Sequence, residues 1–242
     1  MSAPLAVVIP ARNEGRRLPL LLADLASGAG CIGEICIVDG GSGDATASVA
    51  HLGGARVLHA PPNRGAQLAK GIAATSAPWL LLLHADGRLP RGWEQTVIHA
   101  MAQGSGCCWA FHLGIQGRSV GLRVVERLVD WRTGLFQRPY GDQGLLVHRQ
   151  TLAAVGGVSP IPLMEDLELI LRLRTVAPVR MLAGRFLVDG RRWQQLGVLR
   201  TSWTNAQLRR AWRGGEDPQR LAERYGAYQK AQRRCWGSSS QP

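Results

Sequence analysis

The sequence contains no hydrophobic run long enough to cross a membrane. The longest unbroken runs, such as residues 78–83, fall far short of the roughly 18 apolar residues that a spanning helix requires. We therefore expect any contact with a lipid bilayer to be peripheral. Hydrophobic residues still make up 45% of the 242 residues, which is enough to fill the core of one large α/β domain and excludes a disordered chain.

Paired cysteines are also lacking. None of the five cysteines forms a C-x-x-C motif with another, and their distribution is unlike a disulfide framework. We expect no cleavable signal peptide ahead of the first predicted strand. These absences predict a protein of the reducing cytoplasm, with any peripheral membrane contact at the inner face of the membrane.

Acidic residues are few. The chain has 29 Lys and Arg against 17 Asp and Glu, which gives a formal net charge of +12. Residues 191–236 alone hold eleven basic and three acidic residues, so most of the excess lies in the last fifth of the chain. This charge predicts an anionic partner, which is a nucleotide diphosphate, a lipid surface or nucleic acid.

The first half of the chain alternates between short apolar runs and helical patterns. The apolar runs have the composition of strands, and the segments between them repeat apolar residues at helical spacing. Expected strands are residues 5–9, 35–38, 55–58 and 79–83, and expected helices are residues 14–25, 44–52 and 66–75. This alternation predicts an α/β fold with a mostly parallel central sheet and helices on both faces.

The second half is less regular. We expect helices at residues 91–103, 120–135 and 165–176, and strands at residues 107–113 and 144–147. The basic tail is expected to form about two helices, separated by Gly214 and Gly215, with Asp217 and Pro218 opening the second. We divide the chain into a domain of residues 1–195, a basic helical extension of residues 196–236 and a disordered end of residues 237–242.

Polar residues follow three of the predicted strands, where ligands bind in open α/β sheets. The first such segment is residues 10–14, and the second, residues 39–44, is rich in glycine. Its glycines permit close approach of a ligand, and Asp39 is placed to bind a ribose hydroxyl or a base edge. The segment is not a P-loop, because no G-K-[ST] follows. An ordinary strand-to-helix turn capped by Asp44 explains the same residues.

Asp86 lies in the third segment. It follows four consecutive leucines, so a buried strand delivers it to the exposed edge of the sheet. There a carboxylate can hold a hard divalent cation that also binds diphosphate oxygens. A single aspartate at a strand end is also a common turn former, but the expected position on the same edge as Asp39 favours a functional interpretation.

Glu165 and Asp166 open a predicted helix. The helix dipole stabilises carboxylates in a first turn, which explains the pair without any catalytic role. The functional alternative is a general base that accepts a hydroxyl proton at a cleft. A glycoside hydrolase needs carboxylates facing each other across roughly 5 to 9.5 Å. The pair does not fit that class, because adjacent helical residues point about 100° apart.

Several short motifs follow one another in a specific order. They are V-V-I-P-A-R-N-E at residues 7–14, V-D-G-G-S-G-D-A-T at residues 38–46, Asp86, and the pair Glu165 and Asp166. In this order they resemble family 2 glycosyltransferases of the GT-A fold, over roughly the first 190 residues. Three further motifs are similar to the subgroup of transferases associated with radical-SAM and selenium-domain proteins: residues 84–90, 140–144 and 190–193.

The resemblance implies a nucleotide-sugar-dependent, inverting hexosyltransferase and a role for each matched residue. Asp166 would be the catalytic base, and Asp86 would be the metal ligand of the D-x-D motif, with Mn²⁺ or Mg²⁺ stabilising the departing diphosphate. The residues implied for donor binding are Pro10, Ala11, Arg12, Glu14, Asp39, Gly41, Arg64, Lys70 and Asp86. Those implied for the acceptor or the sugar are Trp109, Tyr140, Asp142, Gln143, Glu165, Arg192 and Trp193.

Two positions depart from the family pattern. His84 stands where the family has the first acid of D-x-D, and Gly40 replaces the second acid of a D-D-G-S segment. Imidazole and carboxylate together suit manganese better than magnesium, so we expect His84 and Asp86 to favour manganese. The second departure leaves the nucleotide open. The acceptor is a lipid, a glycan or a small molecule.

Other classes of protein fit parts of the sequence. Arginines interleave with tryptophans in the tail, as in some RNA-binding proteins, but no known nucleic-acid motif is present and nucleic acid is not the expected partner. The tail fits an amphipathic helix pair on an anionic membrane surface better, or a solvated pair packed on the core. A nucleotidyltransferase of similar architecture and a non-catalytic nucleotide-sugar-binding module are the remaining alternatives.

Overall fold

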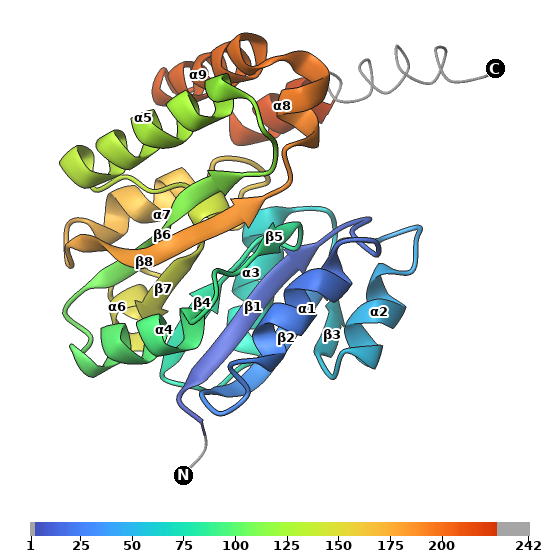
Figure 1. Cartoon of the computed structure of the whole chain (residues 1–242), viewed down its shortest axis with the longest axis vertical. Helices are drawn as coiled ribbons and strands as arrows, with labels where there is room; N and C mark the ends of the chain where they lie inside the picture. Colours follow the sequence, from blue (N-terminus) through green and yellow to red (C-terminus); the bar gives the residue numbers. More distant parts are fainter. Residues whose placement is uncertain (1–2, 227–242) are drawn as a thin grey trace.

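An eight-stranded sheet runs through the molecule in the order β3-β2-β1-β4-β7-β6-β8-β5 (Figure 1). The computed structural model describes residues 3–226. The strands are β1 (Leu5–Ala11), β2 (Ile32–Asp39), β3 (Arg56–His59), β4 (Trp79–Leu82), β5 (Gly87–Arg88), β6 (Cys108–Ile115), β7 (Leu145–His148) and β8 (Val179–Val188). The helices are α1 (Leu18–Ala26), α2 (Thr46–Leu52), α3 (Arg64–Ala73), α4 (Trp93–Ala102), α5 (Val120–Phe136), α6 (Arg149–Ala154), α7 (Glu165–Leu173), α8 (Arg191–Leu196) and α9 (Val198–Arg213), with a short 3-10 helix η1 (Gly141–Gln143).

The sheet has a parallel half and a mixed half. Strands β3, β2, β1 and β4 are all parallel, so the carboxyl ends of β1, β2 and β4 meet at one edge. In the mixed half, β7 is antiparallel to β4 and β6, whereas β8 is parallel to β6 and antiparallel to β5. The predicted α/β fold with a mostly parallel sheet is confirmed.

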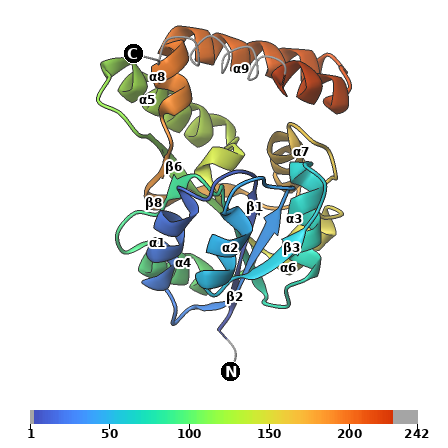
Figure 2. The ribbon, with the colours of Figure 1, turned by 90° about the vertical axis from the view of Figure 1, so that its right-hand side faces the viewer.

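Alternate residues of the central strand fill two separate hydrophobic cores. On β1, Leu5, Val7 and Ile9 belong to the core beneath α1, α2 and α4, whereas Ala6 and Val8 belong to the core beneath α3, α6 and α7. This division follows from the two-residue repeat of a strand. Figure 2 shows α1 and α4 on one side of the sheet and α3, α6 and α7 on the other.

Helices α5, α8 and α9 form a third group, at the end of the molecule away from the first described residues (Figures 1 and 2). Helix α5 packs on β6, and α9 packs on both α8 and α5. Because β1 points its carboxyl end toward this group, the helices lie on the side of the sheet where ligands are expected. None of the described helices is both long and apolar enough to cross a membrane.

The largest shift from a predicted boundary is at α1, which begins at Leu18 instead of residue 14. Glu14 and Gly15 donate their backbone N–H groups to Thr46 Oγ1 at 2.8 Å and to Asp44 Oδ2 at 3.1 Å. These bonds hold the start of the expected helix in a turn against the neighbouring loop. Asp44 Oδ1 also accepts the Thr46 N–H at 3.0 Å, so Asp44 binds the first residue of α2, although the cap position itself is occupied by Ala45.

The sequence analysis missed β5, β8, α6 and α8. Strand β8 was missed because its pattern is interrupted. Its register with β6 jumps from Leu182 to Arg185 around Gly184, which has φ of 91°. A bulge of this kind breaks the alternation of buried and exposed residues that marks a strand in the sequence.

The tail has the predicted helix break within the described residues. Helix α9 ends before Gly214, and Asp217 Oδ1 accepts the N–H groups of Gln219 at 2.8 Å and Arg220 at 3.2 Å, where a helix begins at residue 218. The predicted boundary at residue 195 falls within α8. The predicted disordered end lies outside the described residues.

We expect the centre of the sheet to be the part of the fold most sensitive to a cavity. Leu81 in β4 is fully buried, so Leu81→Ala should lower the free energy of unfolding by about 2–5 kcal/mol. The control is Leu52→Ala, at a side chain 86% exposed on α2, which should change it by less than about 0.5 kcal/mol. Urea unfolding curves measure both, and equal losses would contradict the predicted core.

Candidate active site

The loops after β1 and β2 are tied together by hydrogen bonds. Asn13 accepts the Gly43 N–H on Oδ1 at 2.8 Å, and its own N–H donates to Ser42 Oγ at 2.9 Å. Asn13 has φ of 56°, a left-handed conformation that asparagine tolerates better than most residues. The two candidate segments therefore lie side by side and form one surface at the edge of the sheet.

Gln67 of α3 joins the ends of β1 and β2. Its buried Nε2 donates to the carbonyl oxygens of Val38 at 2.8 Å and Ala11 at 3.3 Å. A Cβ at Gly40 would lie 2.9 Å from that nitrogen, so the glycine that replaces the family's acid fits this packing. The sequence analysis missed Gln67, because nothing in a helical pattern indicates which distant carbonyls a glutamine reaches.

Asp39 is buried at the carboxyl end of β2 and organises its own turn. Its Oδ2 accepts the N–H groups of Gly41 at 3.2 Å and Ser42 at 3.1 Å, and His59 Nδ1 lies 3.5 Å away. Burial by itself raises the pKa of Asp39, but the hydrogen bonds from Ser42, Gly41 and His59 outweigh it and hold the pKa below its ordinary value. The carboxylate is therefore charged at neutral pH.

The remaining residues predicted to bind the donor surround this edge. Pro10 lines the pocket described below, and Arg12 is exposed. Gly41 has φ of 76°, which glycine adopts without strain. Lys70 Nζ donates to the backbone carbonyl of His59 at 2.6 Å, so it joins α3 to the end of β3.

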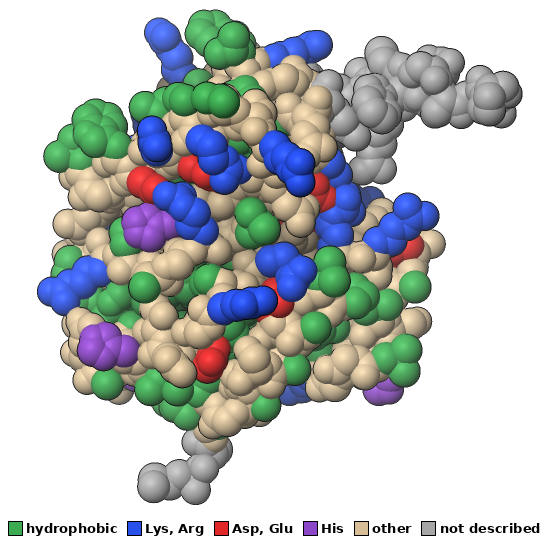
Figure 3. Space-filling model, in the orientation of Figure 1, with side chains coloured by type: hydrophobic (Ala, Val, Ile, Leu, Met, Phe, Trp, Pro, Cys, Tyr) green, Lys and Arg blue, Asp and Glu red, His purple; other side chains and the backbone are tan. Residues whose placement is uncertain are grey.

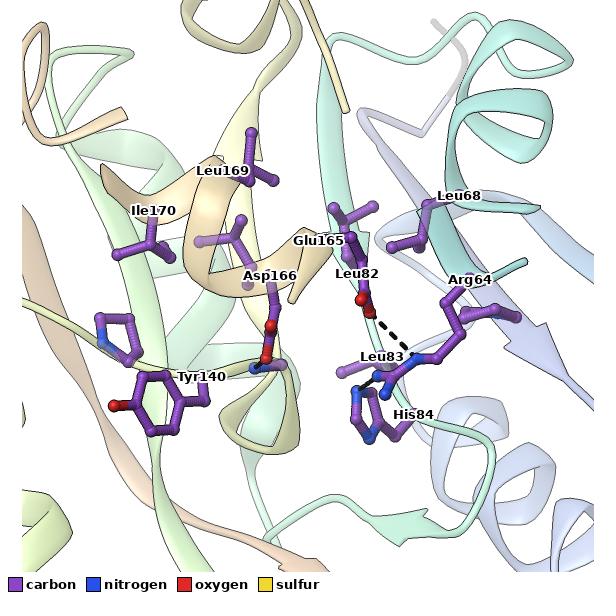
Figure 4. Close-up of a pocket in the computed structure, with 15 residues that line it drawn as sticks. Arg64, Leu68, Leu82, Leu83, His84, Tyr140, Glu165, Asp166, Leu169 and Ile170 are labelled. Carbon is purple, nitrogen blue, oxygen red and sulfur yellow. Dashed lines mark hydrogen bonds and ion pairs between the residues drawn. The ribbon is translucent and has the colours of Figure 1, made fainter. Parts of the chain in front are cut away.

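A pocket of about 470 Å³, part of it open to solvent, lies where α3, α7, η1 and the end of β4 meet (Figure 4). Arg64 Nε lies 3.0 Å from Glu165 Oε1, and the Arg64 guanidinium contacts His84 Nε2. Asp166 Oδ2 accepts the Gly141 N–H at 2.6 Å. The fold thus brings together six residues that the sequence analysis selected from five separate segments: Pro10, Arg64, His84, Tyr140, Glu165 and Asp166.

Gly141 lies between His84 and Asp166. A Cβ at this position would lie 2.7 Å from His84 Nε2 and 3.1 Å from Asp166 Oδ2, so only glycine lets the backbone come this close. Asp166 Oδ1 also accepts the Leu167 N–H at 2.7 Å. A carboxylate has about four acceptor sites, so Asp166, with one backbone donor on each oxygen, can still accept a hydrogen bond from a ligand hydroxyl.

Two neighbouring carboxyl groups have strongly raised pKa values. Burial raises the pKa of Glu165 to about 7, with Arg64 opposing the shift and Asp166 adding to it. Burial likewise raises the pKa of Asp142 to about 6, with Arg132 opposing and Asp166 adding. Both groups therefore titrate close to neutral pH.

Asp86 lies beside a second group of charged side chains. Arg191 Nη2 is 2.9 Å from Glu14 Oε1, and the Arg191 N–H donates to Asp189 Oδ1 at 2.7 Å. Arg17 forms an ion pair with Asp189. Burial is the main cause of the raised pKa of Asp86; the charge of Arg191 opposes it, and that of Asp189 adds to it. Asp189 was missed in the sequence because β8, which delivers it, was missed.

The oxygen atoms near Asp86 fit a divalent cation. Within residues 3–226, no three His, Cys, Asp or Glu side chains are already grouped as a metal site. Glu14 Oε2 is nevertheless buried without a hydrogen-bond partner, and the pKa of Glu14 is raised, first by burial and also by the charge of Asp86. Such a local excess of carboxylate oxygen suits a hard cation.

His84 is neutral, as a metal ligand must be. Burial, and then the charge of Arg64, hold the pKa of His84 well below its ordinary value. Its Nε2 faces Arg64 in this structure, so the predicted pairing of His84 with Asp86 around manganese stays a prediction.

Two arginines from different helices lie against the ring of Tyr140. The Arg132 guanidinium of α5 lies 3.7 Å from the centre of the Tyr140 ring, and that of Arg209 in α9 lies 5.3 Å from it. The pKa of Arg64 also depends on a residue of the tail. Burial alone lowers the pKa of Arg64, but Glu165 raises it, and Tyr225 is among the further groups that do so. The basic tail therefore reaches the pocket, which the sequence analysis did not foresee.

Gln143 supports η1 from within the core instead of facing the pocket. It is fully buried, and its Oε1 accepts from the Tyr140 N–H at 3.2 Å and Thr133 Oγ1 at 3.3 Å. Its Nε2 donates to the Phe111 carbonyl at 3.0 Å. Any influence of Gln143 on the acceptor is thus exerted through the position of Tyr140.

The predicted tryptophans lie in different surroundings. Trp109 is buried against Trp79, with ring centres 5.6 Å apart, at the amino end of β4, whereas the pocket lies at its carboxyl end. The fold therefore does not bring Trp109 to the other candidate residues. Trp193 packs, partly buried, on the core beneath α1. The side chain of Arg192 lies outside the described residues.

Comparison with known proteins gives the class of the fold. Glucosyl-3-phosphoglycerate synthase from Mycobacterium tuberculosis, crystallised with Mn²⁺, uridine diphosphate and phosphoglyceric acid, aligns with a TM-score of 0.57 and 19% identity over 73% of this chain and 67% of its own. S. aureus TarS aligns with a TM-score of 0.59 and 12% identity over 78% of this chain and 37% of its own. The fold is that of GT-A glycosyltransferases.

The sequence comparisons give the family. The family described as glycosyl transferase family 2 matches residues 6–153, so the chain belongs to that family. Uncharacterized glycosyltransferases of Mycobacterium bovis and of Mycobacterium tuberculosis H37Rv are each 35% identical over 100 residues. These alignments span 41% of this chain and 44% of each relative, which is less than half of either protein.

The raised pKa of Glu165 predicts a pH-dependent stability. Glutamate ionises near 4.5 when unfolded and near 7 here, so between these pH values the folded state holds the extra proton and rising pH lowers stability. Glu165→Gln removes this titration. The melting temperature of Glu165→Gln relative to the unmodified protein should therefore rise between pH 5 and pH 8. A constant difference across that range would contradict the prediction.

Proposed function

We propose that this protein transfers a hexosyl group from a nucleotide sugar to an acceptor hydroxyl, with inversion at the anomeric carbon and the help of a divalent cation. The observation that carries the proposal is that Asp166 faces the same pocket as Arg64 and His84, next to the joined loops after β1 and β2. Membership of family 2 supports the transferase activity. The uridine diphosphate in crystals of structural neighbours supports a nucleotide-sugar donor.

In this proposal the donor lies along the joined loops. Charged Asp39 accepts hydrogen bonds from the base or ribose, and Gly41, which has open space around it, allows the nucleotide to approach the backbone. Pro10, Ala11 and Arg12 form the neighbouring wall. Lys70 stabilises this side of the donor site through its hydrogen bond to the end of β3.

A divalent cation is proposed at Asp86, with the carboxylate of Glu14 nearby and His84 as the second predicted ligand. A cation bound there supplies charge that stabilises the departing diphosphate. Glu14 Oε2, which is buried without a hydrogen bond, and the raised pKa of Asp86 support this position, because both are relieved by added positive charge. The manganese preference rests on the imidazole of His84.

Asp166 is proposed as the general base. Its carboxylate takes the proton of the acceptor hydroxyl while that oxygen bonds to the anomeric carbon and the bond to the diphosphate breaks. The N–H groups of Gly141 and Leu167 hold the carboxylate in place for this step. Glu165 is less suited, because it is buried and paired with Arg64, and we propose that it positions Arg64 instead.

The acceptor is proposed to bind beside Tyr140 and Asp142. Arg132 and Arg209 lie against the ring of Tyr140, and neither was assigned to the site from the sequence. The motifs that suggested the radical-SAM-associated subgroup contribute His84, Tyr140 and Arg191, which all belong to the candidate site. Their convergence supports that narrower assignment.

We further propose that residues 1–195 form the catalytic domain and residues 196–236 an extension that helps to close the pocket. The contact of Arg209 with Tyr140 supports this division of roles. A cytoplasmic location is proposed because the described cysteines, which are Cys31, Cys36, Cys107 and Cys108, are free thiols.

Replacement of the proposed base tests the mechanism. Asp166→Asn keeps the size of the side chain and, through its single oxygen, one of the two backbone hydrogen bonds, but it cannot accept the proton. The rate of sugar transfer should therefore fall about 10²–10⁴-fold with donor affinity retained. Asp130→Asn, at a carboxylate paired with Arg185 outside the pocket, is the matched control and should keep its rate. Mass spectrometry of the product distinguishes transfer of a sugar from transfer of a nucleotide, which would favour a nucleotidyltransferase.

Thermal shifts test the donor and metal site directly. UDP-, GDP- and dTDP-sugars are each added with Mn²⁺, Mg²⁺ or EDTA, since a ligand that binds only the folded state raises the melting temperature. We expect one nucleotide to raise it in the presence of metal, and Asp86→Ala to lose that rise. Equal shifts with both metals would count against the manganese preference, and no shift with any nucleotide would count against the donor site.

A further inference from the structure

Helix α5 exposes a continuous hydrophobic stripe. Successive members are three or four residues apart, so they lie on one face of the helix, and each side chain is between 49% and 78% exposed. The opposite face of α5 is buried against the protein. We call these residues the α5 stripe: Val120, Val124, Leu128, Trp131 and Leu135.

Helix α9, which packs on α5, adds two exposed hydrophobic side chains one turn apart. Leu199 is 86% exposed and Trp203 is 66% exposed. Figure 3 shows hydrophobic side chains protruding from this end of the molecule, with Lys and Arg side chains among them. Apolar surface of this extent on one end of a protein marks an interaction site, because water contact with it is unfavourable.

The charged side chains of α5 that are exposed are all arginines. Both acids of α5 are engaged: Glu126 is buried and pairs with Arg123 at 3.0 Å, and Asp130 pairs with Arg185 at 2.5 Å. The sequence of α9 contains no acid at all. Exposed arginines lie just before α5 at Arg118, on α5 at Arg127, and on the packed helix α9 at Arg210 and Arg213.

Apolar side chains rimmed by arginines complement a lipid surface with negative headgroups. Tryptophan and leucine enter the boundary between headgroups and acyl chains, while arginine stems extend toward phosphate groups. A second copy of the chain fits less well, because a two-fold contact through this face would bring Arg127 and its equivalents together. The charge pattern therefore selects a membrane over a partner of the same sequence.

We propose that the α5 stripe, together with Leu199 and Trp203, docks the protein on an anionic lipid surface. The sequence analysis assigned membrane contact to the basic tail alone and treated α5 as an ordinary helix. Since α5 ends at Phe136 and Tyr140 lines the pocket, docking through α5 holds the pocket close to the lipid surface. This docking goes beyond the proposed activity and does not depend on it.

Vesicle flotation with the full chain tests the proposal without any donor or acceptor. We expect binding to vesicles containing phosphatidylglycerol, weaker binding to pure phosphatidylcholine, and loss of part of the binding at high salt because the charge contribution is screened. The double variant Leu128→Glu/Trp131→Glu should bind anionic vesicles at least about tenfold more weakly, since two large apolar side chains are lost from the contact.

The control is Leu52→Glu, which changes an even more exposed leucine on α2, a helix that lies far from α5 along the sheet, and this variant should bind as the unmodified protein does. The melting temperatures of all variants should agree within a few degrees, because every replaced side chain is exposed. Unchanged vesicle binding by the double variant overturns the proposal. The proposal is also overturned if the protein does not bind vesicles and instead forms a concentration-dependent dimer that the double variant abolishes. That result would make a second copy of the chain the partner of this surface.

Discussion

Arg64 is the half-buried cation on which both sides of the candidate site depend. It pairs with Glu165 at 3.0 Å and contacts His84, so one guanidinium joins α3, α7 and the end of β4. Glu165 is itself buried, so removing Arg64 would leave its carboxylate without a compensating charge. At the pocket, the parallel half of the sheet and the mixed half are therefore held together by electrostatic attraction as well as by packing.

The local surroundings give the carboxyl groups of the candidate site different pKa values. Asp39 receives several hydrogen bonds and keeps its charge, whereas burial raises the pKa of Glu165 to about 7 and that of Asp142 to about 6. Asp166 lies among them with one backbone donor on each oxygen. Surroundings, not residue type, separate a carboxylate suited to proton transfer from those suited to holding a turn or orienting an arginine.

Local patterns predicted the parallel half of the fold and the segments that line the site. The apolar runs of β1, β2 and β4 each end in polar residues, and parallel strands bring such ends together at one edge. The sequence patterns did not reveal β8, because a bulge at Gly184 interrupts its alternation, and Asp189 was missed with it. Trp109 was selected by resemblance, yet the fold packs it against Trp79 at the far end of β4.

By itself, the sequence determined the family, the α/β class and the identity of the acids and glycines at the strand ends, because these depend on short segments and their order. Only the tertiary structure decided which of them meet. Gln67 reaches carbonyls of two strands, Arg209 reaches Tyr140 from the tail, and the five residues of the α5 stripe stay exposed among residues 3–226. Each of these outcomes depends on how distant segments pack, and no local pattern of hydrophobicity or charge encodes that arrangement.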